Sequence, residues 1–369
     1  MANFDVIVVG LGGMGSAAAA HASARGKRVL GIEQFQPAHD QGSSHGRSRV
    51  IRLAYFEHPA YVPLLRRAYE LWRRLESQTG RDLLQITGGL MIGSPDSDVV
   101  SGSLRSAREH QLDHELLDAA DIHRRFPPFT PAPGIIALHE HAAGIVFPEE
   151  AIRAHLDVAS DNGARLHFDE RVEEWTVTSS GRIDVRTSRS RYECGRLILA
   201  PGSWAPELFK IDWLDLEVEP QQLHWFDPAD GIAAFQPDRF PIYIWDIGNG
   251  VQFYGFPADD EGRVKVAFFR SKVKGEGPMR DALRPCLPAL ANGTLLETVS
   301  CKYTLTRDRH FVIGLHPDHS NVVIASPCSG HGYKFASVVG EILADLAIDG
   351  ATRHPIDLFD PKRFKDSPS

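Results

Sequence analysis

The chain has 369 residues and a net charge of −8, with 43% hydrophobic and 24% charged residues. This composition is typical of a globular protein, and the length is sufficient for two domains. The negative charge disfavours a nucleic-acid-binding surface, which needs clustered lysine and arginine.

The cysteines and the apolar segments exclude further classes. The four cysteines show no C-x-x-C spacing, which disfavours a zinc site and a disulfide framework. The N-terminal apolar run has no basic segment before it and is interrupted by glycines, unlike a secretory signal. No stretch approaches the roughly 18 apolar residues of a membrane helix. We therefore expect a cytoplasmic protein with reduced thiols, and neither nucleic acid nor membrane as a partner.

The first predicted elements are a strand, a glycine-rich turn and a helix. Residues 4–10 read FDVIVVG, a run typical of a buried strand, and a helix-forming stretch begins at residue 16. Between them Gly10, Gly12 and Gly15 form the pattern G-x-G-x-x-G. Gly10 permits a tight turn, Gly12 lets the backbone approach a pyrophosphate, and Gly15 lets helix and strand pack closely.

The second predicted strand, residues 28–33, ends in an acid. An acidic side chain about twenty residues beyond the glycines accepts hydrogen bonds from ribose hydroxyls, and Glu33 occupies that place. We predict a dinucleotide site that also includes Gly13 and Met14. A glycine turn in an unrelated α/β unit is the alternative, and the motif does not decide between NAD and FAD.

A polar loop follows in place of regular βαβ units. Residues 37–52 read PAHDQGSSHGRSRVIR and hold Arg47, Arg49 and Arg52. Such hydrogen-bonding capacity suits a large polar cofactor that passes beneath the loop. A solvated loop with incidental charges is the alternative.

The next elements are expected to be helical with one strand. The apolar residues of 59–76 fall on one helical face, which predicts an amphipathic helix with Trp72 in the core. Residues 87–93 are predicted to be a strand and 101–125 one or two surface helices. The proline-rich residues 126–134 suit a crossing point between domains.

The second half of the chain is expected to complete two interleaved domains. Residues 144–168 predict a strand, a helix and a strand, and 171–177 predict another strand. Residues 196–208 repeat the strand–glycine–helix order, and 216–299 alternate in β fashion. Residues 310–350 predict two strands, a glycine-rich turn and a closing helix. We therefore expect an α/β protein with a discontinuous cofactor domain and a mainly antiparallel substrate domain.

Four motifs carry a resemblance to a known family. They are GSSHGRSRVIR at 42–52, YGFP at 254–257, SCKYTLT at 300–306 and SGHGYKFAS at 329–337. With these motifs the sequence resembles the monomeric sarcosine oxidase and N-methyltryptophan oxidase family of flavoenzymes over nearly its whole length.

The resemblance implies a fold, a cofactor and a reaction. The fold would be glutathione-reductase-like, with FAD as cofactor, and the substrates would be N-methyl or other secondary amino acids. Oxygen would be the electron acceptor, hydrogen peroxide the by-product, and the protein a monomer. We place the FAD-binding domain at residues 1–85, 145–215 and 300–369 and the substrate domain at 86–144 and 216–299.

By the same resemblance, Cys301 carries a thioether to the 8-methyl carbon of the flavin. A thiolate adds to an electrophilic methide form of the isoalloxazine, and the bond prevents cofactor loss. From the residues alone, a buried small hydrophobic cysteine is the alternative. Cys328 is expected to be a packing residue.

The substrate carboxylate needs a cationic partner in a dry pocket. The resemblance assigns this role to Arg52 and Lys334, with about 1.5–3 kcal/mol for each charge-assisted hydrogen bond. Surface cations are the alternative for both residues.

Lys265 is the only charge in the apolar part of the predicted strand RVKVAFF. The alternating pattern alone fits an outward-facing residue equally well. The resemblance places this lysine beside the flavin N5, where it promotes the reaction with oxygen. A fixed cation about 4 Å from developing superoxide could lower the barrier by ~4 kcal/mol at an effective dielectric constant near 20.

The resemblance also implies the remaining site residues. The catalytic set adds Arg49, Tyr254 and His331 to Lys265. The substrate contacts, besides Arg52 and Lys334, are Tyr254, Trp245, Phe269 and Tyr303. The cofactor contacts are Gly10, Gly12, Gly13, Met14, Gly15, Glu33, Gly42, Ser43, Ser44, His45, Arg49, Val172, Gly202, Trp204, Cys301, Gly330, Gly332 and Lys334.

Two departures from the family pattern bear on the substrate. Phe269 stands where the family often has a histidine, and Trp245 replaces a smaller apolar residue. Together they predict a more aromatic pocket, which suits a bulkier N-alkyl amino acid or a substrate with cationic character.

Metal sites and other functions are weighed last. The histidine pairs at 139–141 and 316–319 lack a third ligand at useful spacing, so we predict no metal. The alternative within enzymes is a flavin-dependent amine dehydrogenase that uses an acceptor other than oxygen. The alternative from another class is an NAD-dependent dehydrogenase or a non-catalytic nucleotide-binding protein.

Overall fold

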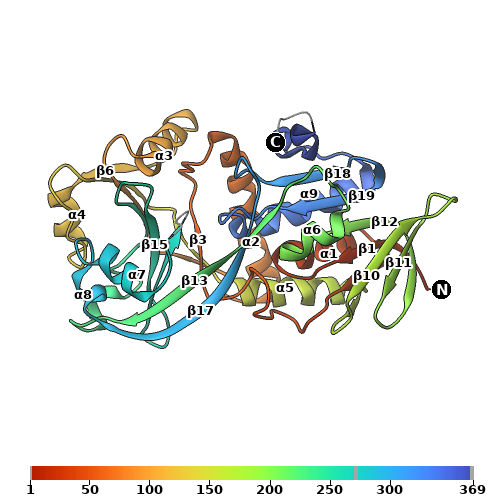
Figure 1. Cartoon of the computed structure of the whole chain (residues 1–369), viewed down its shortest axis with the longest axis horizontal. Coiled ribbons are helices and arrows are strands. Elements are labelled where there is room, and N and C mark those ends of the chain that lie inside the picture. Colours follow the sequence, from red (N-terminus) through yellow and green to blue (C-terminus); the bar gives the residue numbers. More distant parts are fainter. Residues whose placement is uncertain (1, 270–272, 366–369) are drawn as a thin grey trace.

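The structure, a computed structural model, describes residues 2–269 and 273–365. Its strands form two eight-stranded sheets and one three-stranded sheet. Figure 1 shows the two large sheets side by side along the long axis of the molecule. The long strands β13 (Glu217–Asp227) and β17 (Thr294–Leu305) belong to the second sheet and reach toward the first.

The first sheet has a parallel centre. In it β1 is parallel to β2 and β12, β2 to β9, and β12 to β19. Antiparallel hairpins extend it, because β11 pairs with β10 and β12, and β18 pairs with β19. The strands are β1 (Ala2–Val9), β2 (Val29–Ile32), β9 (Arg165–His167), β10 (Val172–Val177), β11 (Ile183–Thr187), β12 (Arg191–Leu199), β18 (Val312–His316) and β19 (His319–Ser326).

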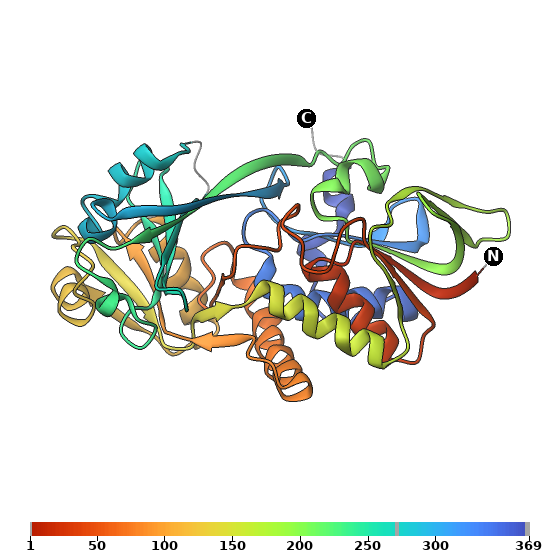
Figure 2. The ribbon, with the colours of Figure 1, turned by 90° about the horizontal axis from the view of Figure 1, so that it is seen from below.

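Helices cover this sheet and bury its apolar strands. Helix α1 (Gly13–Ala24) packs against α5 (Pro148–Asp161) and α9 (Ala336–Asp349), and α2 (Val62–Thr79) packs against α5 and α9. Figure 2 shows α1 and α5 next to each other from below. Parallel strands need such crossover helices and are buried on both faces, which explains why residues 6–9 are continuously apolar.

The second sheet is mainly antiparallel, as the sequence predicted. Its order is β17-β13-β16-β15-β14-β5-β7-β6, and the β14–β5 pair is parallel. The remaining strands are β5 (Gly89–Gly93), β6 (Glu115–Asp118), β7 (Ile136–Glu140), β14 (Ile242–Asp246), β15 (Gln252–Ala258) and β16 (Val264–Phe269).

Side-chain alternation gives this sheet two different faces. On β16, Val264, Val266 and Phe268 enter a hydrophobic cluster together with residues of α4 (Ala119–Arg125), α7 (Glu276–Leu283) and α8 (Pro288–Ala291). Lys265 and Phe269 have the opposite parity, so they lie on the other face.

A small sheet and short helices complete the structure. The small sheet contains β3 (Arg49–Ile51), β4 (Leu84–Ile86) and β8 (Gly144–Val146), and the other α-helices are α3 (Asp98–Glu109) and α6 (Ala205–Phe209). Short 3₁₀ helices are η1 (Pro59–Tyr61), η2 (Gly202–Trp204), η3 (Ile232–Phe235), η4 (Tyr333–Phe335), η5 (Asp357–Phe359) and η6 (Pro361–Phe364).

The predicted elements agree with the structure in most places. The helix expected at 59–76 is a 3₁₀ turn followed by α2, and Trp72 is fully buried. The segment 101–125 contains the unpredicted strand β6 between two helices, and the strand-rich segment 216–299 also contains α7 and α8. The boundary placed at residue 300 falls inside β17, which pairs with β13 as far as Leu305.

Candidate active site

The glycine turn after β1 has the geometry that its spacing predicted. Gly10 has φ +85°, and a Cβ there would lie 2.5 Å from the carbonyl oxygen of Ala200. A Cβ on Gly15 would lie 1.7 Å from the oxygen of Gly10, so this position serves close packing of helix and strand. Beside Gly12 the nearest such atom is Ser44 Oγ, at 3.5 Å, which leaves the N-terminus of α1 accessible.

The turn opens into one large cavity. The cavity is lined by residues of both large sheets and of the polar loop after β2. The predicted site residues that line it are Gly10, Gly12, Gly13, Met14, Glu33, Gly42, Ser43, Ser44, Arg49, Arg52, Val172, Gly202, Trp204, Tyr254, Phe269, Cys301, Tyr303, Gly330, His331, Gly332 and Lys334.

The cavity wall fits a dinucleotide. The Glu33 carboxylate accepts hydrogen bonds from the N–H groups of Leu11, at 2.8 Å, and Phe35, at 3.2 Å, which fixes an acid beside the glycine turn. Ser43 Oγ is buried and has no hydrogen-bond partner among the described residues, so it can receive one from a bound group. Backbone N–H groups at a helix start, an oriented acid and a free hydroxyl are the chemistry that phosphates and ribose require.

Cys301 lies next to Arg49. Cys301 is 3% exposed, and its Sγ is 3.8 Å from Arg49 Nη2 and 3.9 Å from Ser43 O. Arg49 Nη2 also donates to Ser43 O at 2.8 Å and to His45 O at 2.6 Å. The guanidinium therefore ties the polar loop to β17 and places a fixed positive charge beside the sulfur.

Lys265 is buried on the face of the second sheet toward the polar loop, so the outward-facing alternative is wrong. Its Nζ donates to Gly46 O at 2.6 Å and to Ser48 O at 2.9 Å, and it lies 4.8 Å from the centre of the Phe256 ring. Burial lowers the pKa of Lys265 well below its ordinary value, and the charge of Arg49 lowers it further. Lys265 is not among the residues that line the cavity, whereas Arg49, whose Nη1 donates to the same Ser48 oxygen, is.

The two predicted carboxylate-binding cations both line the cavity. Arg52 is 1% exposed, stacks 4.2 Å from the Tyr55 ring centre, and pairs through Nη2 with Glu57 Oε2 at 2.6 Å. Lys334 Nζ donates to His331 O at 2.7 Å. The surface-cation alternative is therefore wrong for both, since each is buried.

Aromatic residues and His331 form the rest of the substrate end. His331 Nδ1 lies 2.6 Å from Tyr55 Oη and its Nε2 lies 3.0 Å from Arg309 O, so both ring nitrogens have partners. The Phe269 ring lies 6.4 Å from that of Tyr254. Burial raises the pKa of Tyr254 and, more strongly, that of Tyr303, which keeps both hydroxyls protonated.

Besides Lys265, the predicted site residues Trp245 and His45 also do not line the cavity. Trp245 faces away from the cavity and stacks on Phe253 at 6.2 Å, inside the cluster beneath α7 and α8. The reason is strand parity, because its neighbour Ile244 lines the cavity instead. His45, a residue of the polar loop itself, is buried, and burial together with the charge of Arg49 lowers its pKa to about 4.

Some cavity residues had no signal in the sequence. Glu57 pairs with Arg52 from a segment without helix or strand. No helical or strand periodicity in the sequence therefore indicated that the two side chains would meet. Cys328 lines the cavity, which corrects its prediction as a packing residue. The position of Cys328 next to the glycine-rich turn at 329–332 was the feature of the sequence that could have indicated this.

The histidine pair at 139–141 has a third polar neighbour that the sequence did not reveal. Strand pairing brings Glu115 beside His139 and His141, with potential ligand atoms within 4.8 Å of one another. The guanidinium of Arg125 already bonds to Glu115 and approaches His139 Nδ1 at 3.3 Å. The positive charge of Arg125 therefore already occupies the place beside Glu115 and His139 that a metal ion would take.

Membrane insertion was also considered. Within residues 2–269 and 273–365, no helix has the length and hydrophobicity of a membrane span.

Sequence comparison identifies similar proteins over the full chain. A family model described as FAD dependent oxidoreductase matches residues 5–346. The monomeric sarcosine oxidase of Streptomyces avermitilis is 48% identical, over 99% of this chain and 99% of that protein. The N-methyl-L-tryptophan oxidase of Salmonella arizonae is 33% identical, over 98% of this chain and 99% of that protein.

Structure comparison agrees. The open form of NikD, an unusual amino acid oxidase essential for nikkomycin biosynthesis, superimposes with a TM-score of 0.84 at 25% identity, over 98% of each chain. L-Proline dehydrogenase from P. horikoshii has a TM-score of 0.85 at 22% identity, over 99% of this chain and 98% of that one, a likeness of fold.

Proposed function

The chain belongs to the FAD-dependent oxidoreductase family, and on this premise we propose that it is an oxidase of N-methyl and other secondary amino acids. The substrate loses a hydride from the carbon bound to nitrogen and a proton from the nitrogen, and water hydrolyses the resulting imine. Bound FAD supplies the two-electron acceptor, and oxygen regenerates it with release of hydrogen peroxide.

One observation carries the proposal. A single cavity is lined both by the dinucleotide turn and by two buried cations, Arg52 and Lys334. Arg52 is 1% and Lys334 5% exposed, so both charges act in a site with little solvent, where they attract the carboxylate of an amino acid in addition to the Glu57 partner of Arg52. Arginine offers a planar fork and lysine a point charge, so together they orient the substrate as well as bind it.

We further propose that FAD is attached covalently through Cys301. Support comes from the position of the sulfur in the cavity wall and from the Arg49 guanidinium 3.8 Å away. The thiolate form of a cysteine is the nucleophile for such a bond, and the guanidinium is a fixed cation beside this sulfur. The same guanidinium would also stabilise the negative charge of a reduced flavin bound in the cavity.

The substrate end suits an N-substituent with apolar surface. Phe269 lies 6.1 Å from Phe56, ring centre to ring centre, and together with Tyr254 it forms an aromatic wall. Trp245 no longer contributes to this argument because it faces away. The aromatic wall therefore consists of Phe269 and Tyr254, and Phe56 packs against Phe269 without lining the cavity itself.

The domain assignment stays a proposal. We propose that residues 1–85, 145–215 and 300–369 bind FAD and that 86–144 and 216–299 form the substrate domain. The separation of the two large sheets supports this division. The expectation of a cytoplasmic monomer also stays a prediction, and light scattering of the purified protein tests the monomer.

A substrate screen with two readouts tests the function. Sarcosine, N-methyl-L-tryptophan and L-proline are supplied to the purified protein, and oxygen consumption and peroxide release are measured together. An oxidase gives equal amounts of both. Turnover only with an artificial electron acceptor would instead identify a dehydrogenase, and a colourless protein without FAD would refute the proposal.

A further inference from the structure

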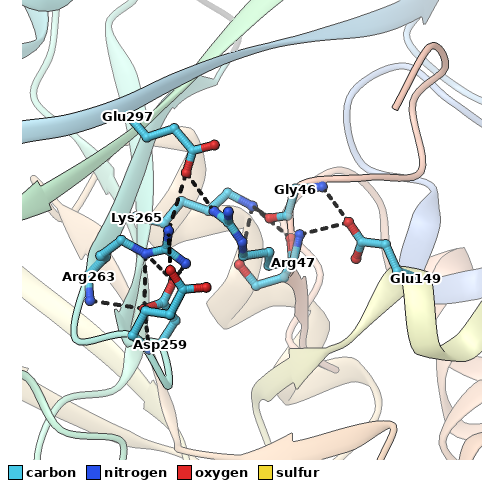
Figure 3. A network of polar contacts seen from close by, with 9 residues as sticks. Gly46, Arg47, Glu149, Asp259, Arg263, Lys265 and Glu297 are labelled. Atoms are coloured by element: carbon cyan, nitrogen blue, oxygen red, sulfur yellow. Dashed lines mark hydrogen bonds and ion pairs between the residues drawn. The ribbon is translucent and has the colours of Figure 1, made fainter. Parts of the chain in front are cut away.

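A turn in the polar loop is held by one carboxylate. Residues Gly46 and Arg47 have φ values of +96° and +67°. Glu149 Oε1 accepts hydrogen bonds from both of their N–H groups, at 2.7 Å for Gly46 and 3.1 Å for Arg47 (Figure 3). Left-handed backbone at a residue other than glycine is unfavourable, so the turn needs such external bonds to persist.

The carbonyl groups of the same turn hold Lys265. Its Nζ donates to Gly46 O at 2.6 Å and Ser48 O at 2.9 Å, and reaches Ser48 Oγ at 3.2 Å. Lys265 is 2% exposed as a whole, so these oxygens fix the position of its amino group. Figure 3 shows Glu149 and Lys265 on opposite sides of the turn.

The two sides of the turn belong to different parts of the fold. Glu149 lies in the first turn of α5, where a carboxylate interacts favourably with the helix dipole. Helix α5 packs against α1, which begins at the dinucleotide turn, whereas Lys265 lies on β16 of the second sheet. The turn therefore connects Lys265 to α5, which packs against the helix that begins at the dinucleotide turn.

The other charges at the turn have their own partners. Arg47 Nη1 pairs with Glu297 Oε2 at 2.8 Å, and Arg263 reaches the same oxygen at 3.4 Å (Figure 3). Arg49 donates to the carbonyl oxygen of Ser48 at 2.8 Å. Among the described residues, Glu149 is thus the carboxylate that binds the backbone of the turn.

We propose that Glu149 is a positioning residue for Lys265: it fixes the turn whose carbonyl oxygens hold the lysine amino group. The inference rests on the proposed function in one respect: it takes Lys265 to promote the reaction of reduced flavin with oxygen, the role that the family resemblance implies for this residue. Glu149 acts on that step through the turn and does not contact the substrate. A displacement of about 1 Å in a catalytic group costs up to about 100-fold in rate, so Glu149→Ala is expected to slow reoxidation about 10- to 100-fold.

The experiment compares the half-reactions of Glu149→Ala, Glu149→Gln and Lys265→Met with those of the wild type. The flavin is reduced with dithionite and mixed with oxygen in a stopped-flow instrument, and its anaerobic reduction by sarcosine is followed separately. Reoxidation should be slow in Glu149→Ala and Lys265→Met, while reduction stays near the wild-type rate. Glu149→Gln keeps an acceptor oxygen in place and should restore most of the rate.

A second readout does not depend on turnover. Hydrogen exchange of the peptide that covers residues 45–49 should be faster in Glu149→Ala and near normal in Glu149→Gln. The matched control is Glu150→Ala, because Glu150 is the neighbouring acid and pairs with Arg81 and Arg153 at the surface. Its exchange and reoxidation should match the wild type.

The double variant Glu149→Ala/Lys265→Met separates the explanations. It should reoxidise no more slowly than Lys265→Met alone, because both changes remove the same interaction. A further loss, or slowing of both half-reactions by Glu149→Ala, would assign Glu149 a general structural role and overturn the inference. Reoxidation at the wild-type rate in Glu149→Ala, together with slow reoxidation in Lys265→Met, would also overturn the inference. The proposed function would then stand. Reoxidation at the wild-type rate in Lys265→Met would show that the lysine has no role in the reaction with oxygen, and the inference would fall with that role.

If Glu149→Ala does not fold, Glu149→Asp replaces it under the same criteria, because its shorter side chain withdraws the carboxylate from the turn.

Discussion

The Arg52–Glu57 pair gives a prediction that separates stability from substrate binding. The two charged groups are 2.6 Å apart, and their side chains are 1% and 2% exposed. Removing one partner from a buried pair leaves the other charge uncompensated, which costs about 3–5 kcal/mol. Arg52→Gln should therefore destabilise the protein as well as weaken substrate binding.

The size of both effects follows from the structure. With about 2.1 cal/mol/K of unfolding entropy per residue, 369 residues correspond to about 0.8 kcal/mol/K, so Tm should fall by about 4–6 °C. Loss of the charge-assisted bond to the substrate carboxylate, about 1.5–3 kcal/mol, should raise KM about 10- to 150-fold. The double variant Arg52→Gln/Glu57→Gln removes both charges and should recover most of the Tm but none of the KM.

The assay is thermal unfolding of the holoprotein followed through flavin fluorescence, together with steady-state kinetics. Arg124→Gln is the control, because its pair with Asp121 lies at the surface with the arginine side chain 72% exposed, and it should leave Tm nearly unchanged. An unchanged Tm in Arg52→Gln would refute the reasoning about the pair. Recovery of KM in the double variant would refute the assignment of Arg52 to the substrate.

Three further predictions test other parts of the site. Cys301→Ser should fold and bind FAD but release it into the supernatant on acid precipitation, whereas the wild-type pellet should stay yellow; a colourless wild-type pellet contradicts the covalent bond. Gly12→Ala should keep Tm and lose affinity for FAD, while Gly15→Ala should lower Tm, since its Cβ would lie 1.7 Å from a backbone oxygen; equal Tm values in the two variants would contradict this. Burial lowers the pKa of His45 to about 4 and that of His155 to about 3. As the pH falls below about 6.5, these two histidines therefore take up protons in the unfolded chain before they do so in the folded protein, which lowers the free energy of unfolding. The urea midpoint should therefore fall between about pH 6.5 and pH 4, and His155→Gln should flatten that slope; a midpoint that rises on acidification would contradict the sign.

The sequence predicted best where structure is local. The strand, turn and helix around Gly10 follow one another directly, so spacing alone predicted the tight turn at Gly10 and the close packing at Gly15. The cofactor role proposed for Cys301 could be predicted only through the resemblance to a family. A cysteine in an alternating strand carries no local sign of what lies opposite it.

What the sequence could not predict depends on pairing between distant strands and helices. Trp245 and Ile244 are both apolar, and only the placement of the sheet decides which of them faces the cavity. Glu149 is 103 positions from Gly46, and nothing in its own surroundings distinguishes it from Glu150. Glu115 joins the histidines of β7 only through the register of β6.

The loop that carries the site arginines explains why stability and charge are linked in this protein. Apart from the short strand β3, residues 46–57 lack regular structure, so their buried N–H groups need other acceptors. Glu149 supplies one acceptor oxygen, and Glu140 accepts from Leu53 and Ala54 at 2.7 and 2.8 Å. Burial raises the pKa of Glu140, while the N–H bonds favour its ionised form.

The same carboxylates that complete the backbone hydrogen bonds therefore also set the charge around Arg49, Arg52 and Lys265. A single substitution changes both properties at once, which is why rate and stability must be separated by paired variants. The chain places its acids on the second sheet, at the start of α5 and in the loop itself. Three acids on different elements thus hold the loop that carries Arg49 and Arg52, and in the proposed function a substrate carboxylate would meet cations that are already oriented.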